Sequence, residues 1–153
     1  MCEHCGCRGV EPIAALLDDH LELHDMSGRI RRAIAADSPD DVADGLRRLA
    51  ELLQPHVEEE ESGLFAALKA DGEFAEHVTE LEHDHAALDV ALASIDLGEP
   101  GWGERLTGLL DELARHMDKE DLGTFPVAVV TLGDEGWKLV NEARTKRLAA
   151  TVG

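Results

Sequence analysis

The sequence contains few aromatic residues and no tyrosine. Only 3% of its 153 residues are aromatic, and alanine and leucine dominate the apolar fraction. Strands favour aromatic and β-branched side chains, whereas helices favour alanine and leucine. The composition therefore disfavours a sheet and predicts an all-α protein. A chain of this length fits one domain with its own hydrophobic core.

Basic residues and long apolar segments are also scarce. The chain has 14 basic residues against 33 acidic ones, which gives a formal net charge of −19. Such a charge repels phosphate groups and argues against nucleic acid and anionic membranes as partners. No apolar stretch reaches the roughly 18 residues that a membrane-spanning helix needs, and the N-terminus lacks the apolar run of a signal peptide. We therefore expect a soluble, cytoplasmic protein.

Cysteine is confined to the N-terminal segment 1–9, where Cys2, Cys5 and Cys7 lie beside His4. Three cysteines so close together cannot cross-link a fold of this length, and an odd number argues against a secreted disulfide scaffold. At this spacing the thiolates could share an additional metal ion or form a redox disulfide. A flexible end without a metal is the alternative, and the sequence leaves both open.

Apolar residues recur at helical spacing over residues 10–153, which we expect to form the folded domain. Long helices are predicted at about residues 11–36, 39–64, 73–95 and 102–121. Their short connections predict an antiparallel up-down four-helix bundle. Pro55 is expected to kink or restart the second helix immediately before His56. Gly133 and Asp134 are expected to open an additional short C-terminal helix that docks against the bundle.

The second and fourth predicted helices contain an internal repeat. Each carries a histidine, a glutamate four residues later, a glycine seven later and a phenylalanine nine later. The repeated residues are His56, Glu60, Gly63 and Phe65 in one helix and His116, Glu120, Gly123 and Phe125 in the other. The preceding helices add one histidine each, His20 and His85. Two such halves imply a pseudo-twofold arrangement around a shared centre.

The histidine and glutamate of each pair lie on one apolar helix face, because residues four apart on a helix are neighbours. Burying a lone carboxylate costs several kcal/mol, and a multivalent cation is one of the few partners that offset this cost. Imidazole with carboxylate suits iron, manganese or zinc better than calcium, and the absence of core cysteines argues against structural zinc. Iron is the metal that we expect.

Four imidazoles and two carboxylates are enough ligands for two metal ions. Each ion would bind two imidazoles and one oxygen from each bridging carboxylate, and a bridging oxo or hydroxo group would be a further ligand. In octahedral geometry one position per ion then stays open for dioxygen, peroxide, nitric oxide or an azide-like anion.

This pattern of His, His-x3-Glu, His and His-x3-Glu on four helices resembles the hemerythrins, especially the bacterial hemerythrin-like proteins. The resemblance covers about residues 13–125 and includes the Gly-x-Phe sequence after each ligand pair. It implies a non-haem di-iron centre that binds or reduces oxygen species, with Glu60 and Glu120 as the bridging carboxylates. The iron ligands that it implies are His20, His56, Glu60, His85, His116 and Glu120.

The chain departs from the oxygen-carrying hemerythrins in two places. Those proteins have His-x3-His in the third helix, where this chain has Leu81 before His85 and Asp89 after it. In the fourth helix their carboxylate lies five residues after the histidine, so Asp121 competes with Glu120 for the bridging role here, although the internal repeat favours Glu120. The missing imidazole argues against oxygen transport and for sensing or turnover of dioxygen, peroxide or nitric oxide. A catalase-like or reductase activity and an electron donor stay open.

Other polar residues near these ligands have open roles. His24, four residues after His20, could be an extra metal ligand or a hydrogen-bonding group. Glu61 and Asp121 are expected to accept hydrogen bonds from ligands or to face solvent. Glu59 is expected on a solvated helix face, as is usual for a run of acidic residues.

Two other functions use the same features. An iron storage or delivery protein would exploit the acidic surface, but ferritin-like bundles place glutamate three residues before histidine, the reverse of the order here. An interaction module would retain the ligands in its core while partners recognise the acidic surface.

Overall fold

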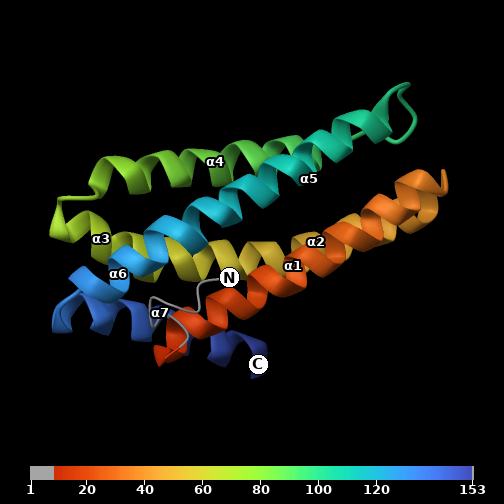
Figure 1. The fold of residues 1–153 in the computed structure, drawn as a ribbon. Helices are drawn as coiled ribbons and strands as arrows, with labels where there is room; N and C mark the ends of the chain where they lie inside the picture. The colour runs from red at the N-terminus through yellow and green to blue at the C-terminus, as the bar shows by residue number, and fades with distance from the viewer. Residues whose placement is uncertain (1–8, 153) are drawn as a thin grey trace.

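The computed structural model describes residues 9–152, and no strand occurs within this part of the chain (Figure 1). The elements in order are α1 (Glu11–Ala35), α2 (Pro39–Glu59), η2 (Glu60–Phe65), α3 (Ala66–Asp71), α4 (Ala75–Ala93), α5 (Trp102–Lys119), η3 (Glu120–Thr124), α6 (Phe125–Thr131) and α7 (Asp134–Val152). The N-terminal cysteines, and the metal or disulfide expected there, lie outside the described residues. None of these helices is long and apolar enough to span a membrane.

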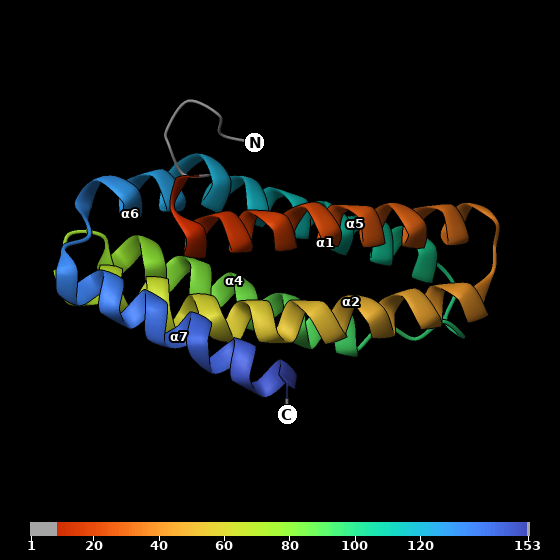
Figure 2. The same ribbon diagram turned by 90° about the horizontal axis from the view of Figure 1, so that it is seen from below.

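The long helices form two antiparallel pairs. α1 and α2 lie side by side in one pair, and α4 and α5 lie side by side in the other (Figures 1 and 2). α7 turns back from the end of α6 and lies along η2, α3 and α2. This arrangement confirms the predicted all-α bundle with an additional C-terminal helix. With 19 residues, α7 is as long as α4 and therefore longer than expected.

The second helix does not restart before His56 as the sequence predicted. α2 runs from Pro39 to Glu59 and contains Pro55 in its interior. A proline removes only one backbone hydrogen bond, and the buried residues Leu49 and His56 hold the helix against its neighbours on both sides of it. The predicted restart at Pro55 is therefore wrong, whereas a kink there stays a prediction, and the irregular backbone comes later.

Both copies of the internal repeat contain a π-helical turn that begins at the repeated glutamate. A π-helix is hydrogen-bonded from residue i to residue i+5, so residues five apart lie on the same side. Glu60 and Phe65 are accordingly both 0% exposed, as are Glu120 and Phe125. The widened turn explains why the repeat ends in a phenylalanine, because it directs the glutamate and the ring into the same core.

Two apolar clusters fill the bundle, and the repeated histidines lie between them. On α1, Ile13 and Leu17 belong to one cluster, Leu23 and Ile30 belong to the other, and His20 comes between. The predicted ligands on the other long helices are also flanked by the two clusters, in the same order along α4 and in the reverse order along the antiparallel helices α2 and α5. The polar core residues therefore form one layer across the bundle, with apolar packing on both sides.

The two glycines of the repeat have different neighbours, which provides a stability test. A Cβ at Gly63 would lie 2.8 Å from Ala143 Cβ and 3.2 Å from Val140 Cα on α7, whereas a Cβ at Gly123 would meet no described atom within 4 Å. We expect Gly63→Ala to lower the free energy of unfolding by about 1–3 kcal/mol because α7 must shift. Gly123→Ala should raise it by up to about 1 kcal/mol, because alanine favours a helix more than glycine does and nothing obstructs its Cβ. Urea denaturation measures both, and equal losses would contradict the packing of α7.

Candidate metal centre

The structure brings six of the seven predicted ligand residues into one buried layer. Their ligand atoms form two groups, and within each group all atoms lie within 4.8 Å of one another. The first group is His20, His56, Glu60 and Glu120, and the second is Glu60, His85, His116 and Glu120. Both glutamates are 0% exposed, and the most exposed of the six, His85, is 7% exposed. Both glutamates belong to both groups, which is the placement that a bridging carboxylate requires.

The two histidines of each group face each other. His20 Nε2 lies 3.1 Å from His56 Nε2, and His85 Nε2 lies 2.8 Å from His116 Nε2. Glu60 directs one oxygen to each pair, because its Oε1 is 3.0 Å from His56 Nε2 and its Oε2 is 3.3 Å from His85 Nε2. The Nε2 atoms and the carboxylate oxygens therefore converge on two neighbouring points.

Glu120 faces both groups with one oxygen, since its Oε1 lies 3.3 Å from His20 Nε2 and 3.4 Å from His116 Nε2. The four carboxylate oxygens of Glu60 and Glu120 are buried and make no well-oriented hydrogen bond to any residue that the structure describes. Buried carboxylates without such bonds are costly, and cations between them and the imidazoles would remove that cost. A donor set of imidazole and carboxylate fits iron, manganese or zinc better than calcium.

Two of the ligand histidines donate a hydrogen bond to the residue that follows a shared glutamate. His20 Nδ1 donates to Asp121 Oδ1 at 2.6 Å, and His85 Nδ1 donates to Glu61 Oε1 at 2.9 Å. A carboxylate that holds the proton on Nδ1 fixes the ring and leaves Nε2 free for a metal. Asp121 thus lies beside an imidazole, whereas Glu120 lies in both ligand groups, which is the division of roles that the internal repeat favours.

The other two ligand histidines donate to aspartates that are absent from the predicted site. His56 Nδ1 donates to Asp19 Oδ2 at 2.8 Å, and His116 Nδ1 donates to Asp84 Oδ2 at 3.2 Å. Each aspartate directly precedes the ligand histidine of the adjacent helix, so an Asp-His dipeptide occurs in both halves. This repeated dipeptide is the signal from which the sequence could have predicted them.

Two arginines of α7, the C-terminal helix, contact the acidic residues near His56. Arg147 Nη1 lies 2.6 Å from Asp19 Oδ2 and 3.0 Å from Glu59 Oε1, and Arg144 Nη1 lies 3.0 Å from the same Glu59 oxygen. Glu59 is only 4% exposed. The expectation that it lies on a solvated face is therefore wrong, because partners far along the sequence cover it. α7 thus holds the aspartate that orients His56.

Removing this connection should destabilise the fold. We expect Arg147→Ala to lower the free energy of unfolding by about 2 kcal/mol, a loss between those of exposed and of fully buried ion pairs. Lys146→Ala is the matched control, because Lys146 is the exposed neighbour on the same helix. Thermal or urea unfolding compares the two variants. Indistinguishable curves would contradict a role of Arg147 in holding α7.

His24 is the predicted ligand that lies outside both groups. It is exposed on α1, where the nearest buried residues are His20, Leu23 and Ser27. The buried face of α1 contains His20 and then Leu23, three residues later. His24 follows Leu23 and is turned by about 100° from it around the helix axis. The spacing of four from His20 therefore does not direct His24 into the layer, and we do not propose it as a metal ligand.

The carboxylates around the imidazoles raise the pKa values of these imidazoles. Burial lowers the pKa of His20, but the hydrogen bond to Asp121 and the nearby carboxylates of Glu120 and Glu60 outweigh burial and raise it to about 12. Burial also lowers the pKa of His56, and the charge of Glu60 leads the groups that raise it to about 9. Burial raises the pKa of Glu60 itself, but the neighbouring imidazoles lower it well below its usual range. Without a metal, the layer therefore pairs imidazolium with carboxylate.

The fold and this layer define a class of protein, namely helical bundles that bind metal through histidines and shared carboxylates. In a comparison with protein-family models, the hemerythrin HHE cation binding domain matches residues 11–128. This match covers most of the chain, which therefore belongs to that family, and it confirms the resemblance seen in the sequence. No curated protein and no solved structure matched the chain.

Proposed function

We propose that the chain holds a non-haem di-iron centre with a bridging oxo or hydroxo group, and that it binds, senses or turns over dioxygen, peroxide or nitric oxide. The observation that carries the proposal is the membership of Glu60 and Glu120 in both ligand groups. One metal ion needs no shared carboxylates, whereas two ions a few Å apart are commonly held by them. The structure thus supports two ions rather than one.

The residues of the chain have distinct parts in this proposal. Iron, when bound, would supply electrons and a coordination position for the oxidant. The histidines present Nε2, and the acidic residues at Nδ1 keep each ring in one orientation. The additional histidine of the oxygen-carrying hemerythrins would lie four residues after or before His85, where this chain has an exposed Asp89 and a buried, 1% exposed Leu81. Neither residue provides an imidazole, which favours sensing or turnover over transport.

The cellular compartment of the protein is part of the same proposal. The odd number of cysteines and their position in one short segment favour a reducing, cytoplasmic environment. Reduction of peroxide or nitric oxide would require an electron donor, whereas catalase-like disproportionation of peroxide would need none, because one peroxide molecule reduces another.

Metal binding should release protons at neutral pH. Burial lowers the pKa of His85, but Glu60 leads the groups that raise it to about 9, the value also found for His56, and His20 reaches about 12. These rings are therefore protonated at pH 7 without metal, and a metal ion must displace the Nε2 protons. Apparent metal affinity should rise as the pH increases from 7 towards 9.

Calorimetric titration with ferrous iron at pH 7 in buffers of different ionisation enthalpy measures this release. The observed heat should depend on the buffer, and His24→Ala should behave like the natural chain because His24 is exposed outside the layer. Heats that are independent of the buffer would show that the rings are already neutral.

Reaction of the reduced iron-loaded protein with each oxidant tests the functional part of the proposal. Dioxygen, hydrogen peroxide and nitric oxide are added separately under anaerobic control, and visible absorption is recorded. We expect at least one to produce absorption bands of an oxidised or nitric oxide-bound iron pair. An unchanged spectrum with all three would contradict the proposed function.

A further inference from the structure

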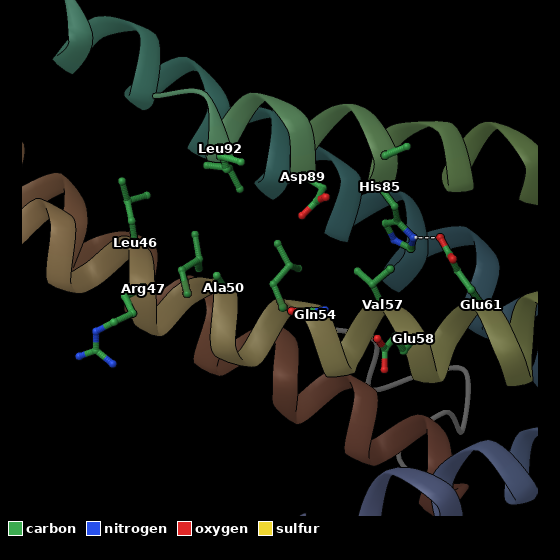
Figure 3. A pocket seen from close by; sticks show the side chains of 14 residues that line it. Leu46, Arg47, Ala50, Gln54, Val57, Glu58, Glu61, His85, Asp89 and Leu92 are labelled. Atoms are coloured by element: carbon green, nitrogen blue, oxygen red, sulfur yellow. Dashed lines mark hydrogen bonds and ion pairs between the residues drawn. The ribbon is translucent and has the colours of Figure 1, made fainter. Parts of the chain in front are cut away.

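An apolar pocket of about 540 Å³ lies between α2 and α4 and extends to a predicted ligand (Figure 3). Leu46, Leu53 and Val57 line it from α2, and Leu92 lines it from α4. His85 stands at one end of it, where its ring meets Glu61. The pocket therefore connects the outside of the bundle with an imidazole of the metal layer.

A second cavity, of about 10 Å³, lies where the layer meets the apolar cluster that contains Leu23 and Leu88. His56, His85, His116 and Glu120 contribute to its wall, together with leucines of the neighbouring cluster. A cavity of this size has room for about one water-sized molecule. It is the space next to the predicted ligands that a small oxidant would occupy.

Three residues line both spaces, and they are Leu53, Val57 and His85. Leu53 and Val57 are half-buried, so the partition between the two spaces consists in part of side chains that change rotamer rapidly. On this geometry we propose that the pocket between α2 and α4 is the route by which a small neutral oxidant reaches the metal pair, with Leu53 and Val57 as the partition that it passes. This inference rests on the proposed function.

The imidazole of His20, on α1, packs against an aromatic ring. His20 lines neither of the two cavities, and its ring stacks on Phe125 with centroids 5.4 Å apart. Phe65 stacks on His85 in a similar way, at 5.5 Å, but His85 still borders both cavities. The route therefore approaches the group that contains His85 and His116.

The charges along the pocket favour a neutral molecule. Glu58, Glu61 and Asp89 line it, and carboxylates repel anions. The lining arginine, Arg47, is already paired with acidic residues of its own helix, at 2.6 Å and 2.9 Å. Dioxygen and nitric oxide thus fit the route better than azide or another anion does.

Leu53→Trp tests the route, and Leu52→Trp is its matched control. Leu52 is the adjacent residue of α2 and is also half-buried, but it lines neither cavity. The rate constant for binding of nitric oxide to the reduced iron-loaded protein is measured by stopped-flow absorption. We expect Leu53→Trp to slow binding by about tenfold, Leu53→Ala to accelerate it, and Leu52→Trp to stay within about twofold of the natural chain.

Iron content and xenon binding are the readouts that do not depend on the reaction. Leu53→Trp should keep its iron but lose the xenon that we expect in the pocket of pressurised crystals of the natural chain, since apolar cavities bind xenon. Normal iron content with an unchanged nitric oxide rate in Leu53→Trp and Leu53→Ala would overturn the route and leave the proposed function intact. A natural chain that binds no iron would overturn both.

Discussion

Glu60→Ala is expected to abolish binding of both metal ions. Glu60 provides an oxygen to each ligand group, with Oε1 beside His56 and Oε2 beside His85. Alanine removes a ligand from each ion at once and leaves four imidazoles that repel each other when protonated. After anaerobic reconstitution, iron per chain should fall from two to near zero, as elemental analysis measures.

The acidic run around this residue supplies its controls. Glu58→Ala removes an exposed neighbour and should leave the iron content unchanged. Glu61→Gln weakens the acceptor of the His85 hydrogen bond, and affinity should fall by about 10–100-fold without loss of the site. Retention of two iron ions by Glu60→Ala would contradict the bridging role.

Removal of the metal is expected to cost the protein much of its thermal stability. Without metal, the carboxylate oxygens of Glu60 and Glu120 are buried and lack well-oriented hydrogen bonds among the described residues. An ion present at a thousand times its Kd stabilises by about 4 kcal/mol. Each kcal/mol changes the Tm of a chain of this size by roughly 2–4 °C. We therefore expect the chelated protein to melt roughly 10 °C or more below the iron-loaded protein.

Differential scanning calorimetry before and after chelation, and after iron is restored, measures this difference. Glu60→Ala serves as the control, because its Tm should not respond to iron. An equal Tm for the loaded and chelated forms of the natural chain would show that the layer is stable without metal and would contradict the account of its buried carboxylates.

The sequence predicted the bundle and the convergence of the six ligand residues in the buried layer. Both depend on the spacing of residues within single helices. A histidine and a glutamate four apart occupy one helix face, and two copies of the pattern indicate a common centre. For His24 the sequence left a ligand and a hydrogen-bonding group open, and His24 lies outside both ligand groups because the buried face of α1 continues through Leu23 instead. The restart expected at Pro55 does not occur, because packing holds the helix on both sides of the proline.

What the sequence did not predict depends on contacts between distant segments. Asp19 and Asp84 lie among the many acids of a strongly acidic chain. The repeated Asp-His dipeptide distinguishes them, but their distances show that their partners are His56 and His116 on other helices. Glu59 is buried by an arginine more than eighty positions away. The π-helical turns follow from the need to bury a glutamate and a phenylalanine five residues apart.

The most direct test of the central claim is the iron content of the purified natural chain after anaerobic reconstitution, measured together with protein concentration. A centre in which Glu60 and Glu120 join two ligand groups predicts two iron ions per chain. Fewer than one iron ion per chain would contradict the existence of the paired site.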